Sequence, residues 1–200
     1  MSRWALIIGP KKSDKTGAAL GLRDALERQG ISVAGFLQSK RFDAENRLFY
    51  DITRLSTGEI RPLAEEAINE SGSNDVTFCA LRFKESAFDA AKVWLEEDSR
   101  SADVIILGDV SKVEIAGQGH FESIQRSLSM SDEKLVVLCV RADQLFYIVE
   151  KFGLEDDTSN FLELPAEEEE LDDFYREVVK DVESVRANGR TSRNPHSGSA

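Results

Sequence analysis

The chain has 200 residues, with 25 Lys and Arg against 37 Asp and Glu and a formal net charge of −12 at pH 7. This length is sufficient for one well-packed domain. The acidic balance excludes a general nucleic-acid binder, which needs a basic surface, so any anion site must be local. No run approaches the roughly 18 apolar residues of a membrane span, and residues 1–4 lead into a strand rather than a signal peptide. We therefore expect a cytoplasmic protein with no membrane or nucleic-acid partner.

A strand, a loop and a helix open the chain. Residues 4–9, WALIIG, are apolar and end in glycine, and residues 15–29 carry apolar side chains at helical spacing. Gly30 follows the helix in the usual position after a helix end, and a second strand begins at residue 31. The pattern predicts a β-α-β unit.

The remaining elements follow from the same patterns. Nearly continuous apolar runs predict central parallel strands that are covered on both faces, and a polar DAENR turn predicts an antiparallel hairpin. The fold class is therefore α/β, with a mainly parallel sheet, helices on both faces and an added β-hairpin. The expected elements are hairpin strands 33–42 and 47–56, a strand or extended segment 76–83, helix 86–100, strand 102–109, helix 116–130, strand 134–141, helix 142–154 and edge strand 160–164.

The C-terminal part has a different character. We divide the chain into a domain over residues 1–165, an amphipathic helix over 166–187 and a disordered tail over 188–200; residues 69–75 are the expected mobile internal loop. The helix carries an apolar stripe formed by Leu171, Phe174, Val178, Val179 and Val182. Such a stripe needs a partner surface, either the sheet edge of this domain or a second chain.

The cysteines and histidines give little sign of chemistry. Cys79 and Cys139 lie in apolar strand-like runs, where a thiol behaves as a small apolar group. His120 has no second ligand at metal-binding spacing, and His196 lies in the tail. We interpret all four as structural or solvated residues.

The loop at residues 9–16 reads GPKKSDKT and matches seven of the eight positions of the phosphate-loop pattern. Gly9 opens the loop, Lys15 supplies an ammonium for the β- and γ-phosphates, and Thr16 supplies a hydroxyl for Mg²⁺. The N-terminus of the following helix also favours anions. The loop therefore predicts a site for ATP or GTP with Mg²⁺.

Asp14 is the departure, because the pattern has glycine there. A carboxylate about 5 Å from a phosphate at an effective dielectric near 20 costs on the order of 3 kcal/mol, or roughly a hundredfold in affinity. Lys11 and Lys12 can offset part of this repulsion, and together with Ser13 they complete the candidate nucleotide contacts. In the alternative interpretation, Ser13 or Asp14 simply caps the helix.

A second candidate region is DVIILGDVSKVEI at residues 103–115, because ligands in open α/β sheets bind at the carboxyl ends of strands. The apolar run ends in Gly108, so Asp109 alone supplies a carboxylate for Mg²⁺ or for catalysis. Glu114 is the second catalytic candidate if the loop folds back. Otherwise Glu114 is a solvated charge or an acid at a helix start.

Three blocks together resemble the small P-loop nucleoside-triphosphatases of the thermophile and human cancer-related type. These blocks are GPKKSDKTG, GISVAGFLQSKRFDAENRLFYDI and VIILGDVSKVEI, within residues 4–153. The resemblance implies a P-loop NTPase-like fold and carries site roles. It places Gly9, Lys15 and Thr16 on phosphate and Mg²⁺ positions, and Lys112 and Glu114 on matching Lys and Glu positions. Three other positions depart from the family: Gly108 stands where the family has its Mg²⁺-associated Asp, Asp109 where it has the catalytic Glu, and Ser111 where it has a Gly.

Three functional hypotheses follow. In the leading one, the protein is a degenerate P-loop protein that binds nucleotide weakly, with slow or absent hydrolysis. In the second, it is a non-catalytic interaction module whose C-terminal helix serves a protein partner or self-association. In the third, it is an active nucleoside-triphosphatase in which Asp109 performs both acidic roles.

Overall fold

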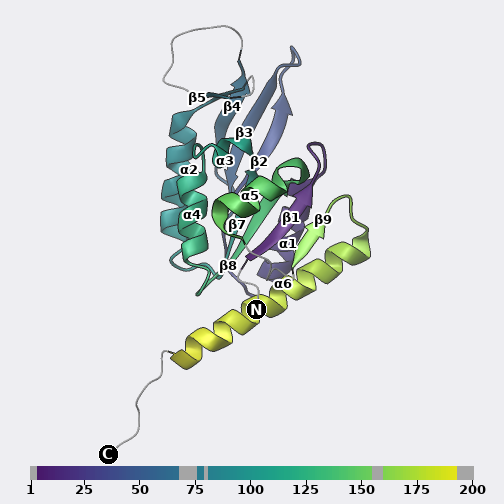
Figure 1. Cartoon of the computed structure of the whole chain (residues 1–200), viewed down its shortest axis with the longest axis vertical. Helices are drawn as coiled ribbons and strands as arrows, with labels where there is room; N and C mark the ends of the chain where they lie inside the picture. Colours follow the sequence, from purple (N-terminus) through teal and green to yellow (C-terminus); the bar gives the residue numbers. More distant parts are fainter. Residues whose placement is uncertain (1–3, 68–75, 79–80, 155–159, 193–200) are drawn as a thin grey trace, which may run out of the picture.

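The computed structural model describes residues 4–67, 76–78, 81–154 and 160–192. Within this part the strands form one nine-stranded sheet in the order β5-β6-β4-β3-β2-β7-β8-β1-β9 (Figure 1). The strands are β1 Trp4–Gly9, β2 Val33–Phe42, β3 Leu48–Arg54, β4 Ile60–Glu66, β5 Val76–Phe78, β6 Leu81–Phe83, β7 Val104–Val110, β8 Leu135–Arg141 and β9 Phe161–Glu163. The predicted α/β fold class is confirmed.

Helices connect the parallel strands. They are α1 Lys15–Arg28, α2 Glu85–Asp98, α3 Lys112–Ile115, α4 Phe121–Ser129, the 3₁₀ helix η1 Ala142–Gln144, α5 Leu145–Phe152 and α6 Glu168–Ser192. The single helix predicted over residues 116–130 is wrong in its start, because Gly117 and Gly119 have φ of 77° and 62° and separate α3 from α4.

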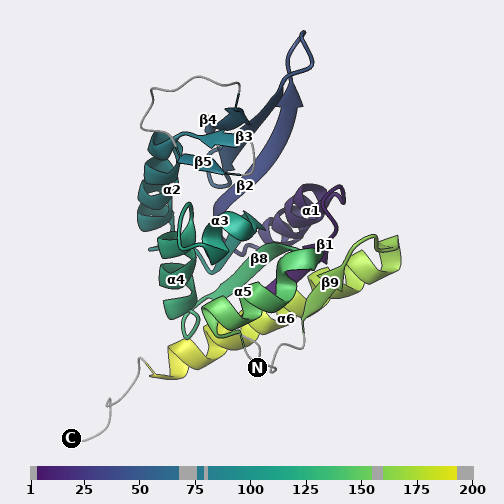
Figure 2. The same ribbon diagram turned by 45° about the horizontal axis from the view of Figure 1, so that its top comes forward.

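The sheet has two halves of different character. Strands β2, β7, β8, β1 and β9 pair in parallel, and each strand bears apolar residues on both faces. The other half, here called the antiparallel extension, consists of β3, β4, β6 and β5. The predicted hairpin joins the two halves: β2 and β3 pair out to Phe42 and Leu48 and project beyond the rest of the sheet (Figure 2).

Strand β4 was not predicted. Its sequence, IRPLAEE, contains a proline and buries only Leu63 and Ala64, so it lacks the alternating pattern that identifies a strand. Residues 69–75, Cys79 and His196 lie outside the described residues.

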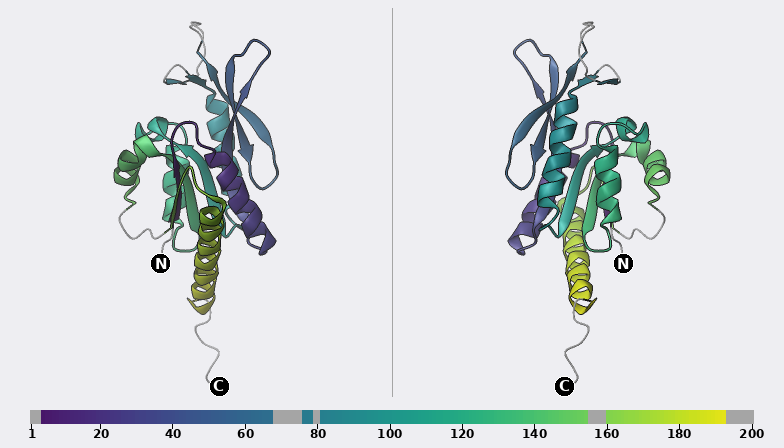
Figure 3. Two further views of the ribbon diagram at one scale, coloured as in Figure 1. Left: turned by 90° about the vertical axis from the view of Figure 1, so that its right-hand side faces the viewer. Right: turned by 90° about the vertical axis from the view of Figure 1, so that its left-hand side faces the viewer.

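Alternation along the strands builds a separate core on each face. In β1, Ala5 and Ile7 join one core with α1 and α6, while Leu6 and Ile8 join the other with α2, α4 and α5. Figure 3 shows the sheet from its edge, with α1 in purple and α5 in green on opposite sides. The prediction of helices on both faces is confirmed.

The C-terminal helix docks on its own domain. Phe174, Val178 and Val182 are buried in the core that also contains α1, and the Tyr175 hydroxyl donates to the Ala18 carbonyl at 2.8 Å. The apolar stripe therefore packs against its own domain, which is one of the two partner surfaces expected for it. Helix α6 continues to Ser192, past the expected boundary at residue 187. The disorder expected for residues 193–200 remains a prediction, since these residues lie outside the described part.

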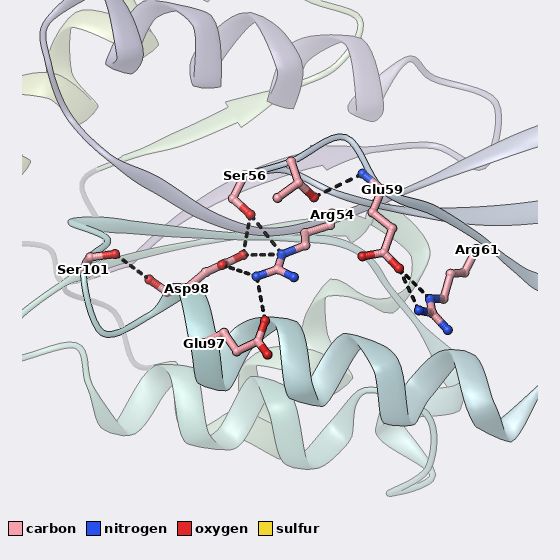
Figure 4. Close-up of polar contacts among 8 residues, drawn as sticks. Arg54, Ser56, Glu59, Arg61, Glu97, Asp98 and Ser101 are labelled. Atoms are coloured by element: carbon pink, nitrogen blue, oxygen red, sulfur yellow. Dashed lines mark hydrogen bonds and ion pairs between the residues drawn. The ribbon is translucent and has the colours of Figure 1, made fainter.

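An ionic network ties the antiparallel extension to the end of α2 (Figure 4). The Nε atom of Arg54, in β3, donates to Asp98 Oδ2 at 2.9 Å, and its Nη2 donates to Glu97 Oε2 at 2.9 Å. Ser56 also donates to Asp98 at 2.6 Å. Because carboxylates are unfavourable at the negative end of a helix dipole, the guanidinium both neutralises them and fixes the extension against α2.

No helix among the described residues is long and apolar enough to cross a membrane.

Candidate functional site

The loop between β1 and α1 lies at the carboxyl end of the parallel strands, where the helix N-terminus faces the same edge. Ser13 donates to the Pro10 carbonyl through both its backbone N–H, at 3.0 Å, and its hydroxyl, at 2.9 Å. A Cβ at Gly9 would lie 2.2 Å from Ser13 Oγ. A side chain at position 9 would therefore displace the Ser13 hydroxyl from this arrangement.

Lys15 and Asp109 meet across this edge. The Lys15 Nζ atom lies 3.7 Å from Asp109 Oδ1 and 3.4 Å from the Pro10 carbonyl oxygen, and Lys15 is only 6% exposed. Asp109 has a φ of 53°, and the pairing of β7 with β8 shifts register between Leu107 and Val110. This irregularity turns the Asp109 carboxylate toward the phosphate loop. The two residues predicted from separate motifs therefore lie together.

Asp14 is the N-cap of α1, which is the alternative role considered for it. Its carboxylate accepts the Gly17 backbone N–H at 2.8 Å. Its φ of −85° and ψ of 60° do not need the left-handed conformations that favour glycine. Asp14 therefore raises no steric problem for the loop, and its effect on an anion is electrostatic.

A cavity of about 300 Å³ lies between the loop and the ends of β2 and β7. It is lined by the predicted residues Lys11, Ser13, Asp14, Lys15, Thr16 and Asp109. The Thr16 hydroxyl donates to the Gln38 carbonyl at 3.0 Å, which leaves oxygen lone pairs for a cation. Lys12 instead lines a neighbouring cavity of about 360 Å³, together with Lys11, Asp109 and Glu114.

Gly108 occupies a tight position in β7. A Cβ there would lie 3.0 Å from the Leu37 Cα and 3.2 Å from the Gln38 backbone nitrogen. These are backbone atoms of the neighbouring strand β2, which cannot rotate away as a side chain can. A side chain at this position, where the resemblance places a carboxylate, therefore requires β2 to shift by a few tenths of an ångström.

Glu114 is buried, so the interpretation as a solvated charge is wrong. It is the third residue of α3 and forms a capping box: Oε2 accepts the Ser111 N–H at 3.0 Å, while Oε1 accepts the His120 N–H at 3.3 Å. Burial raises the pKa of Glu114 to about 7, and the two N–H bonds oppose that rise. The carboxylate thus holds the two ends of the Ser111–His120 loop together.

The histidine and the cysteine of the described residues, His120 and Cys139, are both buried. His120 packs between the rings of Phe36 and Phe88, with centroids at 4.3 and 4.8 Å, and burial lowers its pKa to about 3. Cys139 is buried beneath the phosphate loop, and burial raises the pKa of its thiol to about 12. The structural interpretation of Cys139 is confirmed.

Several residues of this edge were not predicted, among them Gln38, Lys40, Tyr50 and Arg141. Arg141 ends β8, so the rule that sites lie at the carboxyl ends of parallel strands could have identified it. Tyr50 comes from the hairpin, where only pairing with β2 brings it to the site. No local motif identifies such a residue.

A family model described as NTPase matches residues 5–170. The chain belongs to this NTPase family. Membership confirms the resemblance and implies nucleotide and Mg²⁺ binding in general. A search of curated proteins found no match.

Two solved structures share the fold of this NTPase-family chain. The solution structure of a human cancer-related nucleoside triphosphatase has a TM-score of 0.66 and 19% identity, covering 92% of this chain and 98% of that one. The crystal structure of THEP1 from the hyperthermophile Aquifex aeolicus has a TM-score of 0.61 and 17% identity, covering 90% of this chain and 99% of that one. At these identities the comparison establishes the fold.

The family implies a Mg²⁺ ion, and the residues of this site fit that ion only in part. Thr16 and Asp109 line one cavity, so a hydroxyl and a carboxylate are available to hold the ion, directly or through water. Mg²⁺ commonly keeps several waters and takes its remaining ligands from substrate phosphates. When bound, it would neutralise charge on those phosphates. The second carboxylate expected from the resemblance is missing at Gly108.

Proposed function

We propose that the protein binds the triphosphate of ATP or GTP at residues 9–16 with low affinity and hydrolyses it slowly or not at all. The observation that carries the proposal is the Asp14 cap. Its carboxylate takes the Gly17 N–H, one of the helix N-terminal donors that an anion would use, at 2.8 Å. A phosphate must therefore approach a place that this chain already fills with negative charge.

The arrangement of acidic residues at the end of β7 supports the proposal that hydrolysis is slow. Among the described residues, Asp109 forms an ion pair with the Lys15 ammonium, at 3.7 Å. One group would have to neutralise Lys15, help to hold Mg²⁺ and orient water. Glu114 takes none of these roles in this arrangement, because both of its oxygens already accept backbone N–H groups.

A second candidate function is active hydrolysis with Asp109 as the acidic group. It is favoured by the arrangement of Lys15, Thr16 and Asp109 around one cavity. The interaction-module hypothesis loses its main support, since the apolar stripe of α6 packs against α1 and the sheet.

Thermal unfolding with and without 5 mM Mg·ATP or Mg·GTP tests the proposal. A dissociation constant near 1 mM predicts stabilisation of about 1 kcal/mol, or a rise of roughly 2–4 °C. Lys15→Met should abolish the shift, whereas Lys151→Met, on exposed α5, should keep it. Equal shifts in both variants would contradict binding at the loop. Turnover near 1 s⁻¹, at the low end of ordinary enzymes, would favour the active alternative.

A further inference from the structure

A cavity of about 360 Å³ lies beside the phosphate loop and extends beyond the residues that the proposed function uses. Strand β2 supplies Lys40 to its lining, and the antiparallel extension supplies Tyr50 and Phe83. Helix α2 supplies Phe88, and α3 supplies Lys112. Its volume falls within the range of small-molecule sites. It shares Lys11, Gln38, Lys40, Tyr50 and Asp109 with the phosphate-loop cavity, but Lys15 and Thr16 do not line it.

Aromatic rings form one wall of this cavity. The Phe83 and Phe88 rings stack with centroids 5.8 Å apart and planes inclined by 25°, and both side chains remain partly exposed. Tyr50 is half-buried nearby, with Lys40 Nζ 5.9 Å from its ring centroid. Partly exposed aromatic faces in a concave site stack favourably on planar heterocycles.

Unpaired cations form another wall. Lys11, Lys12, Lys40 and Lys112 are exposed and line the cavity, and none has an ion-pair partner among the described residues. Four such lysines at one place are a local exception in a chain of net charge −12. Arg141 lines the same cavity, with its guanidinium held by Asp143 at 3.0 and 2.5 Å. The wall is complementary to an anion.

The carboxylates in the lining do not cancel this charge. Asp109 pairs with Lys15, and both Glu114 oxygens accept backbone N–H groups. Glu66 is exposed at the rim and can accept hydrogen bonds from sugar hydroxyls or ring amino groups. The cavity therefore combines a surface for a ring, donors for an anion and an acceptor at its rim.

We propose that this cavity binds a phosphate ester of a planar heterocyclic nucleoside, of the nucleoside monophosphate class, as a ligand separate from the triphosphate. The ring stacks on Phe83 and Tyr50, and the phosphate faces the lysines. Lys15 does not line this cavity, so a Lys15 variant distinguishes failure of this proposal from failure of triphosphate binding.

Calorimetric titration of the full chain with GMP and AMP tests this assignment, with guanosine, ribose 5-phosphate and inorganic phosphate as partial ligands. We expect each partial ligand to bind at least tenfold more weakly than the monophosphates, because each lacks either the ring or the charge. Equal binding of ribose 5-phosphate or inorganic phosphate would overturn recognition of the ring. Absence of GMP and AMP binding at millimolar concentration would overturn the site.

Variants locate the ligand. Phe83→Leu and Lys40→Gln should each weaken GMP binding about tenfold, while Lys15→Met should change it less than about twofold. Lys40 is exposed, so Lys40→Gln keeps the test valid if Phe83→Leu loses stability. The matched controls Phe146→Leu and Lys151→Gln, both on α5, should bind normally. If Lys15→Met abolishes binding while Phe83→Leu and Lys40→Gln retain it, the monophosphate occupies the phosphate loop and the assignment is wrong.

Discussion

The two ends of the candidate site depart from the P-loop pattern in physically different ways. At the loop, Asp14 is exposed and makes a local bond to the Gly17 N–H, three residues on along the same chain segment. At the end of β7, Gly108 is buried against the backbone of Leu37 in another strand. One departure is a replaceable cap, whereas the other is part of the packing of the sheet.

This difference determines which departure a single substitution can reverse. Removing the Asp14 side chain disturbs one capping bond. Adding a Cβ at Gly108 requires the backbone of β2 to shift by a few tenths of an ångström. The loop end should therefore respond to mutation mainly through ligand affinity, and the β7 end mainly through stability.

The largest expected effect is on the pH dependence of stability near the end of β7. Glu114 and His120 change the free energy of unfolding with pH in opposite directions. The folded pKa of Glu114, about 7, exceeds its ordinary 4.5, so the folded state binds the proton more tightly and stability falls as pH rises from about 4.5 to about 7. The folded pKa of His120, about 3, is below 6.5, so its contribution to stability rises with pH up to about 6.5. The two slopes oppose each other in the shared window.

Glu114→Gln should remove one of these slopes. Relative to wild type, the unfolding free energy of the variant should increase by about 3 kcal/mol between pH 4.5 and pH 7. Urea unfolding at several pH values measures this change, and comparison with wild type cancels contributions from other groups. The exposed control Glu133→Gln should run parallel to wild type. A parallel curve for Glu114→Gln would show that its carboxyl titrates normally.

The next effect tests whether packing selects glycine in β7. Gly108→Asp should destabilise the fold by about 2 kcal/mol and Gly108→Ala by about 1 kcal/mol, because both add a Cβ against β2 and Asp adds a charge in a buried strand. Denaturant midpoints measure both. If Gly108→Asp keeps wild-type stability and hydrolyses nucleotide faster with Mg²⁺, the two ends do not differ in the way proposed.

Much of the fold was predictable because its signals are local. The runs at β7 and β8 and the glycine after α1 identify central strands and a helix end from a few neighbouring residues. The contributions of Tyr50 and Lys40 were not predictable, since they depend on hairpin pairing between β2 and β3. The path of the loop from Ser111 to His120 was equally hidden, because it depends on the burial of Glu114.

The candidate site was predictable in its residues but not in their relations. The motif identified Lys15, and the end of an apolar strand identified Asp109, yet their 3.7 Å separation arises from the positive φ of Asp109. The constraint at Gly108 comes from Leu37 and Gln38 of β2, which are distant in the sequence. Such packing constraints leave no pattern in a single sequence.

The smallest effect concerns the loop end, where Asp14→Gly should raise Mg·ATP affinity about tenfold. The gain is smaller than the Coulomb energy at 5 Å suggests, because Asp14 is exposed and water and salt screen its charge. Stability should fall by only a few tenths of a kcal/mol, since glycine is tolerated at an N-cap. Titration calorimetry and thermal unfolding of the same samples measure the two quantities.

Asp14→Asn separates the two roles of this side chain. Asparagine keeps an oxygen that can accept the Gly17 N–H but carries no charge, so this variant should gain affinity like Asp14→Gly while retaining wild-type stability. If only the glycine variant gains affinity, backbone freedom at position 14 is the limiting factor. If neither gains, the carboxylate does not oppose the phosphates, and weak binding must be traced to the missing carboxylate at Gly108.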